Sequence, residues 1–475
     1  MSDEITADIC VIGAGSAGLS VAAGAAQMGA RTVLIEAGKM GGDCLNTGCV
    51  PSKSLLAAAK AAKAVRGAHR FGVEAGEPRI DFMKVHDYVH GVIGAIAPND
   101  SIERFTKLGC TVIKDHARFL DGRTVAAGGK NVRARRFVIA TGSRASVPPI
   151  AGLAGVPYFT NESIFENTVF PDHLIVIGAG PIGCEMAQAH RRLGAKVTMF
   201  DIARMMPKDD PAAVDVVRRR FLAEGIETAE LVKVLSVEKT DRGVAVVIEQ
   251  AAGERRIEGS HLFVAAGRRP NVENLGLEAA GVRYSAAGIE VDARLRSSKK
   301  RIFAAGDVAG GYQFTHMAGY HAGIIIRNAL FRMPAKNTPK AFPWVTYTDP
   351  ELAQVGLTEE QARRQQGDNI RVLHAAFSEN DRAHAEGEIE GFLKAVLSKR
   401  GHVLGATIVG AHAGELILPW VLAISEGRKI GALANVVVPY PTLSEITKRA
   451  AGSYYTPTLF SERTRKLVRF LGVFG

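Results

Sequence analysis

Cysteine and long apolar runs are both scarce in this chain of 475 residues. The five cysteines are an odd number with irregular spacing, which excludes the disulfide framework of small secreted proteins and favours a reducing, cytoplasmic location. No basic region precedes an apolar segment at the N-terminus, so we expect no secretory signal. The longest apolar stretches, such as HLIVIGAG, fall well short of the roughly 20 residues that a spanning helix needs. We therefore expect no transmembrane helix.

Motifs for binding nucleic acid are also absent, although the net charge is +11. The arginine clusters are scattered along the chain, as is typical of solvated faces. No zinc-finger spacing, homeodomain-like helix or aromatic stacking pattern is present. We predict no nucleic-acid partner and no metal site. Binding of anionic dinucleotides is enough to account for the positive net charge.

Two of the few cysteines lie close together in GGDCLNTGCVPSKS, residues 41 to 54. A disulfide between Cys44 and Cys49 would close a very short ring, so it would stabilise the fold little and would be strained. A strained disulfide is easily reduced, which is a property of disulfides that carry electrons rather than of structural ones. The pair is therefore a candidate redox centre.

An internal repeat surrounds this segment. DICVIGAGSAG (8 to 18) and HLIVIGAGPIG (173 to 183) are apolar runs that end in glycines, and each is followed by an Ala-rich helical stretch and a second strand. This pattern predicts two βαβ units in which a glycine-rich turn and a helix N-terminus bind a pyrophosphate. The candidate phosphate-binding glycines are Gly13, Gly15, Gly18, Gly178, Gly180 and Gly183.

An acidic residue ends the second strand of each unit at the same distance from the first glycine. These residues are Glu36 and Asp201. A carboxylate there accepts hydrogen bonds from ribose hydroxyls and repels a 2′-phosphate. Asp201 thus favours NAD(H) over NADP(H), although Arg204 nearby weakens that preference. Two dinucleotides and a cysteine pair indicate an electron relay that a flavin can connect.

With these motifs the chain resembles the flavin-dependent pyridine nucleotide-disulfide oxidoreductases, which include lipoamide dehydrogenase, glutathione reductase and mercuric reductase. The resemblance covers essentially the whole chain, and the cysteine segment is its most specific part. The other matching segments are RFVIATGS (136 to 143), HLFVAAGRRPN (261 to 271), RIFAAGDVAG (301 to 310) and PWVTYTDPELAQVG (343 to 356).

The resemblance implies an α/β fold with two Rossmann-like dinucleotide-binding domains, for FAD and for NAD, and a C-terminal α+β dimerisation domain. The implied boundaries are 1–150 and 271–340 for the FAD-binding domain, 151–270 for the NAD(P)-binding domain and 341–475 for the interface domain. FAD would contact Gly13, Gly15, Gly18, Glu36, Lys53, Ala117, Gly142, Asp307 and Met317, whereas NAD(H) would contact Gly178, Gly180, Gly183, Asp201 and Gly267.

The resemblance also gives the two cysteines different roles. Cys49 would lie on the flavin side as a thiolate, and Cys44 would exchange with the substrate. The sequence supports this division, because Pro51 suits the first turn of a helix whose N-terminus would stabilise a thiolate on Cys49. Lys53, one turn on, would pair with Glu185 beside the flavin ring and tune its potential.

The chain departs from the family pattern in VVVPYPTLSEI, residues 436 to 446. In lipoamide dehydrogenase and glutathione reductase a histidine precedes Pro-Thr and exchanges protons with the thiols, and a glutamate five residues later orients it. Here Glu445 is present, but Tyr440 occupies the histidine position. A phenol with an ordinary pKa near 10 is a poor proton shuttle near pH 7. Histidines elsewhere, such as His321, are alternative bases.

We therefore expect an FAD-dependent NAD(P)H oxidoreductase with a mercuric-reductase-like active site. It would be a homodimer in which Tyr440 and Glu445 of one subunit complete the cysteine site of the other, and its acceptor would be a small molecule. One alternative is an NAD-dependent dihydrolipoyl dehydrogenase. Another is a flavin-binding redox sensor or scaffold with slow turnover. The basic and apolar tail from Leu459 to Phe474 would either pack on the protein's own surface or rest on an acidic membrane face.

Overall fold

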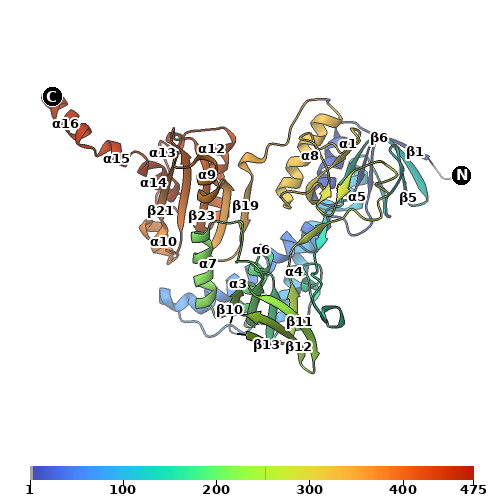
Figure 1. Cartoon of the computed structure of the whole chain (residues 1–475), viewed down its shortest axis with the longest axis horizontal. Helices are drawn as coiled ribbons and strands as arrows, with labels where there is room; N and C mark the ends of the chain where they lie inside the picture. The colour runs from blue at the N-terminus through green and yellow to red at the C-terminus, as the bar shows by residue number, and fades with distance from the viewer. Residues whose placement is uncertain (1–3, 252, 475) are drawn as a thin grey trace. The chain divides into compact units, whose positions relative to one another are not determined.

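The computed structural model describes residues 4–251 and 253–474. The chain forms two compact units (Figure 1). Unit 1 comprises Met1–Ile202 and Ala229–Thr338, and unit 2 comprises Ala203–Thr228 and Pro339–Gly475. No helix in the described ranges is both long and apolar enough to cross a bilayer.

The first βαβ unit lies in a seven-stranded sheet of order β3-β2-β1-β6-β5-β4, with β18 also paired to β6. Strands β1, β2, β3, β6 and β18 run parallel, whereas β4, β5 and β6 pair antiparallel. The bounds are β1 (Glu4–Ile12), α1 (Ser16–Gln27), β2 (Thr32–Ile35), β3 (Cys110–Ile113), β4 (Arg118–Asp121), β5 (Thr124–Ala127), β6 (Lys130–Ile139) and β18 (Ile302–Ala304).

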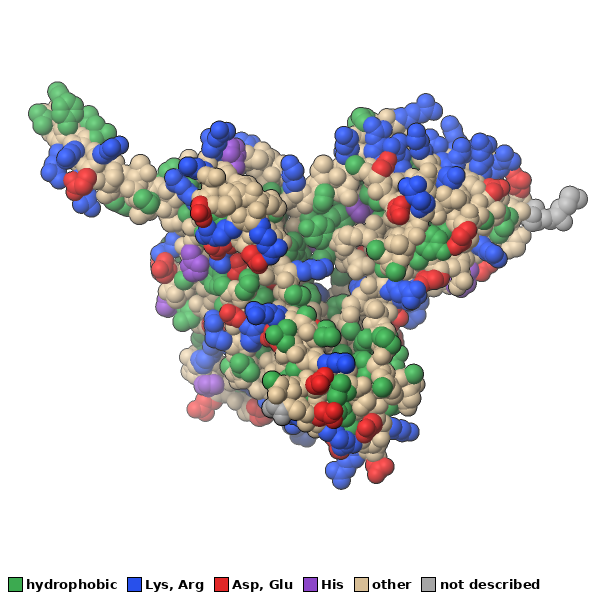
Figure 2. Space-filling model, in the orientation of Figure 1, with side chains coloured by type: hydrophobic (Ala, Val, Ile, Leu, Met, Phe, Trp, Pro, Cys, Tyr) green, Lys and Arg blue, Asp and Glu red, His purple; other side chains and the backbone are tan. Residues whose placement is uncertain are grey.

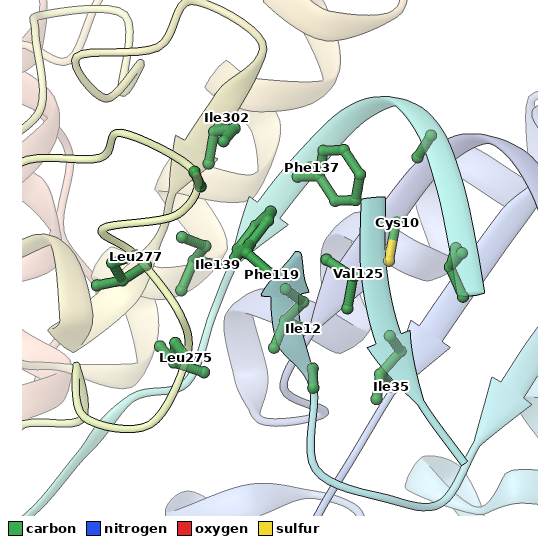
Figure 3. Close-up of a cluster of buried hydrophobic side chains, with 14 of the residues drawn as sticks. Cys10, Ile12, Ile35, Phe119, Val125, Phe137, Ile139, Leu275, Leu277 and Ile302 are labelled. Atoms are coloured by element: carbon green, nitrogen blue, oxygen red, sulfur yellow. The ribbon is translucent and has the colours of Figure 1, made fainter. Parts of the chain in front are cut away.

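Both faces of the sheet are buried at the C-terminal half of β1, so Ile9 to Ile12 form a continuous apolar run, whereas Glu4, Thr6 and Asp8 precede it. Cys10 and Ile12 point to the face that β4 and β5 cover, where they pack with Phe119 and Val125 (Figure 3). Ile9 and the other alternate residues pack on the opposite face, which α1 and α8 (Thr315–Ala329) cover. Cys10 is thus a core residue with no exposed surface.

The second βαβ unit repeats this plan. Strands β8 (His173–Ile177), β9 (Lys196–Asp201) and β14 (His261–Val264) are parallel, and α6 (Pro181–Arg192) connects β8 to β9. An antiparallel sheet of β11 (Lys233–Thr240), β12 (Gly243–Gln250) and β13 (Gly253–Gly259) shares a hydrophobic core with it. Cys184, on α6, is fully buried.

Unit 2 is built on an antiparallel five-stranded sheet of order β19-β20-β23-β22-β21. Its core centres on Trp420, whose indole N–H donates to Thr447 Oγ1 at 3.2 Å. The elements are α7 (Pro211–Ala223), β19 (Pro343–Thr346), β20 (Glu351–Gly356), α9 (Glu359–Gln366), β21 (Ile370–Ala376), α10 (Asp381–Glu386), β22 (Phe392–Ser398), β23 (Val403–Gly410), α11 (Ala413–Leu416), α12 (Leu418–Ser425), α13 (Gly431–Ala434), α14 (Glu445–Ser453), α15 (Thr456–Leu459) and α16 (Glu462–Leu471).

Strand β10 (Ile226–Glu230) is an edge strand of the second parallel sheet, whose order is β10-β9-β8-β14. Two further sheets have two strands each: β7 (Ser143–Ala145) with β15 (Arg268–Pro270), and β16 (Tyr284–Ser285) with β17 (Gly288–Ile289). The helices α2 (Gly42–Asn46), α3 (Cys49–Gly67), α4 (Phe82–Ile96) and α5 (Ile102–Lys107) lie between β2 and β3 in the chain.

The predicted α/β architecture is confirmed, and the domain boundaries stay predictions. The structure differs from them at residues 203–228, which the sequence placed in the NAD(P)-binding domain and which group with unit 2. Side chains hold this segment there. Asp210 accepts from Lys394 Nζ at 2.9 Å, and Asp209 accepts from the indole of Trp344 at 2.6 Å.

Candidate active site

Both glycine turns have the same geometry. Gly13 and Gly178 adopt φ values of +103° and +113°, and a Cβ on either would lie 2.4 Å from the carbonyl oxygen of Ala140 or Ala265. A Cβ on Gly18 or Gly183 would lie within 2 Å of the carbonyl oxygen of the first glycine in its own turn. The protein's own backbone therefore requires these four glycines.

The middle glycine of each turn is different. Gly15 and Gly180 are the N-cap residues of α1 and α6, and neither cap has a side-chain hydrogen bond. A Cβ on Gly15 would come no closer than 3.8 Å to another atom, and one on Gly180 would meet nothing within 4 Å. The space in front of both helix N-termini is thus open to an anionic ligand, which fits the pyrophosphates of FAD and NAD(H).

The two acidic residues support these turns from the next strand. Glu36 Oε2 accepts from Ala14 N at 2.5 Å, and Asp201 Oδ2 accepts from Ala179 N at 2.6 Å. Each carboxylate is therefore fixed beside its glycine turn. The sequence predicted the ribose contact of these carboxylates but not this bond to the backbone.

The cysteine pair lies on two successive helices, with Cys44 in α2 and Cys49 as the first residue of α3. Both are free thiols; Cys49 is exposed and Cys44 half-buried. The hydrogen bond from the Cys44 thiol, followed by one from Thr315, lowers the pKa of Cys49 to about 6, and the Lys53 charge acts in the same direction. The same bond to Cys49 is the main reason why the pKa of Cys44 is raised.

Thr315 is a contact that sequence reasoning missed. Its Oγ1 lies 3.3 Å from Cys49 Sγ, and it begins α8. It directly precedes His316 and Met317, but nothing in the sequence pattern distinguishes it from an ordinary helix-starting residue.

The structure pairs Lys53 with Glu185 across α3 and α6. Lys53 Nζ lies 2.8 Å from Glu185 Oε2, and the carboxylate side chain is only 6% exposed. The pair thus fixes α3, which carries Cys49, against the N-terminal half of α6.

A polar network connects the cysteine segment to Asp307. Ser143 Oγ donates to Asp307 Oδ2 at 2.5 Å and accepts from Arg268 Nε at 2.8 Å. Arg268 also forms an ion pair of 3.2 Å with Asp43, the residue before Cys44. Burial raises the pKa of Asp307. The sequence singled out only Asp307, although Ser143 and Arg268 each directly follow a glycine that it predicted as a cofactor contact.

The other predicted cofactor contacts lie in unit 1. Gly142 and Gly267 adopt φ values of +67° and +121°, and a Cβ on either would meet no atom within 4 Å. Ala117 and Met317 are buried. His321, an alternative base, is buried with its pKa lowered to about 4, and its Nδ1 accepts from Gly306 N. The imidazole is therefore neutral near pH 7, and its Nδ1 is engaged by the Gly306 N–H.

Tyr440 and Glu445 lie in unit 2. Tyr440 is 71% exposed, and its hydroxyl donates to Asp381 Oδ2 at 2.9 Å. That bond raises the pKa of Tyr440. Glu445 begins α14 and accepts from Thr442 N at 3.4 Å. Asp381 and Glu445 both line a pocket of about 220 Å³. The phenol is thus oriented by Asp381, a residue that the sequence did not single out, rather than by Glu445.

A group of possible metal ligands lies outside this site. Among the described residues, His86 and His90 on α4 bring ring nitrogens within 4.8 Å of each other and of a Glu166 carboxylate oxygen. His90 Nε2 already lies 3.0 Å from the carbonyl oxygen of Phe165. The sequence analysis did not single out these residues.

Family models match almost the whole chain. Residues 7–322 match the pyridine nucleotide-disulphide oxidoreductase family, and residues 342–451 match its dimerisation domain. The chain belongs to this family. It is a flavoprotein disulfide oxidoreductase, and its family uses FAD and NAD(P)H. The predictions of the family and of an oxidoreductase enzyme are confirmed.

Curated relatives of two activities are similar to the chain. A mercuric reductase of Staphylococcus aureus is 33% identical over 447 residues, which cover 94% of this chain and 82% of the relative. A dihydrolipoyl dehydrogenase of Thermus scotoductus is 36% identical over 464 residues, which cover 94% and 97%.

Solved structures agree with this relationship. LpdA from Mycobacterium tuberculosis matches with a TM-score of 0.86 at 27% identity, over 94% of this chain and 99% of that chain. The HOCl-induced flavoprotein disulfide reductase RclA from Escherichia coli matches with a TM-score of 0.83 at 26% identity, over the same shares of the two chains.

Proposed function

We propose that this family member uses FAD and NAD(H) to reduce an acceptor that is held by thiolates, as a soft metal ion is, rather than an organic disulfide. The observation that supports the proposal most directly is the hydrogen bond from Tyr440 to Asp381. It raises the pKa of a phenol that replaces the family's histidine, so this position supplies no proton near pH 7.

The residues present fit both cofactors. Gly15, Glu36 and Asp307 would hold FAD, and Gly180 and Asp201 would hold NAD(H). When bound, FAD supplies hydride transfer between the nicotinamide and the cysteine pair. Because Asp201 presents a carboxylate beside the second glycine turn, we assign NAD(H) rather than NADP(H).

The two thiols suit different tasks in the reduced enzyme. With a pKa of about 6, Cys49 is mostly thiolate at pH 7, in about tenfold excess over the thiol. Cys44 stays protonated until an acceptor arrives. A soft cation binds thiolates strongly, so it displaces the Cys44 proton itself. Two electrons then pass to the cation, and the Cys44–Cys49 disulfide forms again.

An organic disulfide makes a different demand. When Cys44 attacks an organic disulfide, it expels a thiolate that a nearby acid must protonate. In the reverse direction, oxidation of the organic dithiol needs a base that takes the thiol proton. Lack of such a group typically costs about a hundredfold to ten-thousandfold in rate. The proposal therefore predicts slow turnover with lipoamide.

A dihydrolipoyl dehydrogenase is the second candidate. The Thermus scotoductus relative at 36% identity and the position of Asp201 favour it. In either case the dimerisation domain supports a homodimer, and we propose that Tyr440 and Glu445 of one subunit act at the cysteines of the other.

The test compares NADH oxidation with lipoamide and with thiol-complexed Hg(II) at pH 7. Wild-type enzyme should reduce Hg(II), and Tyr440→His should raise the lipoamide rate by about a hundredfold or more because it restores a proton shuttle. Tyr440→Phe is the matched control, which removes the hydroxyl but keeps the ring, and its lipoamide rate should stay low. Fast lipoamide turnover by the wild type would refute the proposal and establish the second candidate.

A further inference from the structure

The C-terminal segment, residues 456–474, exposes an unusual amount of apolar surface. No residue of α16 is buried. Scattered exposed apolar residues are normal, but a contiguous group marks an interaction surface. The members of this group are each at least 54% exposed: Leu459, Phe460, Leu467, Val468, Phe470, Leu471, Val473 and Phe474.

The spacing of these residues gives α16 two faces. Leu467, Phe470 and Leu471 follow the i, i+3, i+4 pattern that aligns side chains on one side of a helix, and Phe474 lies three residues beyond the end of α16. The rings of Phe470 and Phe474 contact each other, with centroids 5.3 Å apart.

The other face is basic. Arg465 and Arg469 lie opposite the apolar row and Lys466 lies at its edge, whereas Arg463, four residues before Leu467, adds a fourth positive charge on the apolar side near the start of the helix. Glu462 is the single acidic residue of α16, so four positive charges and one negative charge leave +3. Figure 2 shows hydrophobic side chains at the end of this segment and Lys and Arg side chains beside them.

Local sequence encodes this helix. The Ser461 side chain accepts from Thr464 N as the N-cap, and Glu462 in the first turn complements the helix dipole. Thr464 Oγ1 also donates to Thr458 O at 2.8 Å, which ties α16 to α15. These bonds fix where the helix begins, and a helix of 10 residues gains further stability when its apolar face is covered.

Two observations indicate what covers the segment. The dimerisation-domain match ends at residue 451, so the segment lies outside the matched domain. A second copy carries the same net charge of +11, which makes it a poor complement for a basic face. An anionic bilayer accepts both faces at once, because headgroups pair with the basic side chains and acyl chains take up the aromatic and aliphatic ones.

We propose that residues 456–474 form an interfacial anchor that holds this enzyme on an anionic lipid surface, with α16 lying in the plane of the membrane. The inference goes beyond the proposed function and does not depend on which acceptor the cysteines reduce. The anchor would hold the oxidoreductase at the membrane surface, where it would encounter acceptors that reach that surface.

Flotation of the full-length, FAD-loaded enzyme with vesicles tests the anchor. The protein should float with phosphatidylserine-containing vesicles at low salt, should bind pure phosphatidylcholine vesicles far less, and should be released as salt screens the basic face. The triple variant Arg465→Glu, Lys466→Glu, Arg469→Glu should weaken binding by about a hundredfold or more, since each basic side chain near the surface contributes roughly fivefold.

The matched control is Lys107→Glu, Lys130→Glu, Lys300→Glu, which makes the same change in net charge at exposed positions of unit 1. It should float like the wild type, and both triple variants should keep their flavin content and NADH oxidation rate. Phe470→Ser with Leu471→Ser tests the apolar face and should also abolish binding. Failure of the wild type to float with anionic vesicles would overturn the proposal. So would tail variants that change the oligomeric state in vesicle-free solution, because that result assigns the segment to contacts between copies.

Discussion

The low pKa of Cys49 depends on its neighbour Cys44, and this dependence can be tested directly. The hydrogen bond from the Cys44 thiol is the largest cause of the shift from the ordinary cysteine value to about 6. Cys44→Ala removes that donor. Cys44→Ser replaces it with a hydroxyl, which also donates to a thiolate.

The expected pKa values follow from the remaining contacts. In Cys44→Ala, Thr315 and the Lys53 charge still lower the pKa of Cys49, but burial and Asp43 oppose them, so the pKa should rise well above the wild-type value of about 6. The thiolate share at pH 7 should then fall from about nine-tenths to a minority. In Cys44→Ser the pKa should stay within about one unit of the wild-type value.

The assay is the ultraviolet absorbance of the thiolate in the reduced enzyme, followed as the pH is raised. Alkylation rates alone would mislead, because a thiolate of higher pKa is also a stronger nucleophile and partly offsets its smaller population. Equal midpoints for wild type and Cys44→Ala would refute the assignment of the shift to the Cys44 bond. They would transfer the cause to the helix N-terminus and Lys53.

Two further predictions concern the second glycine turn. Gly180→Ala should fold, because its Cβ would meet no protein atom within 4 Å, but it should raise the KM for NADH. Gly183→Ala should lower the folding yield and the melting temperature, because its Cβ would lie 1.9 Å from Gly178 O. Equal melting temperatures for the two variants would contradict this distinction. Asp201→Ala should reduce the ratio of NADH to NADPH turnover by about tenfold or more because it removes the charge that repels a 2′-phosphate, and an unchanged ratio in steady-state assays would show that Asp201 does not select the cofactor.

The parts of the site that the sequence predicted are those with local physical causes. Gly13 and Gly18 are needed because the chain returns on itself within a few residues, and a side chain would strike the backbone there. The two candidate redox cysteines lie five positions apart, so their proximity is visible in the sequence. Lys53 and Glu185 lie 132 positions apart, and only the resemblance to a family predicted their pairing.

The parts that the sequence did not predict depend on tertiary packing. Thr315 reaches Cys49 across 266 positions, and Ser143 reaches Asp307 across 164. A hydroxyl residue in either place looks like an ordinary helix-starting or strand residue. The association of residues 203–228 with unit 2 has the same origin, because Asp210 pairs with Lys394, which is 184 positions away.

In the proposed function, the residue that selects the acceptor is separate from the residues that build the two cofactor turns. The glycine turns, Glu36 and Asp201 are fixed by backbone contacts, so any change there costs folding or cofactor binding. Tyr440 is 71% exposed and makes its hydrogen bond to another exposed side chain, so replacing it should cost little stability. Under the proposed roles, a tyrosine in place of a histidine at this position would remove a proton donor and leave the glycine turns and their carboxylates unchanged. Relatives with two different activities at similar identity to this chain are what that separation would produce.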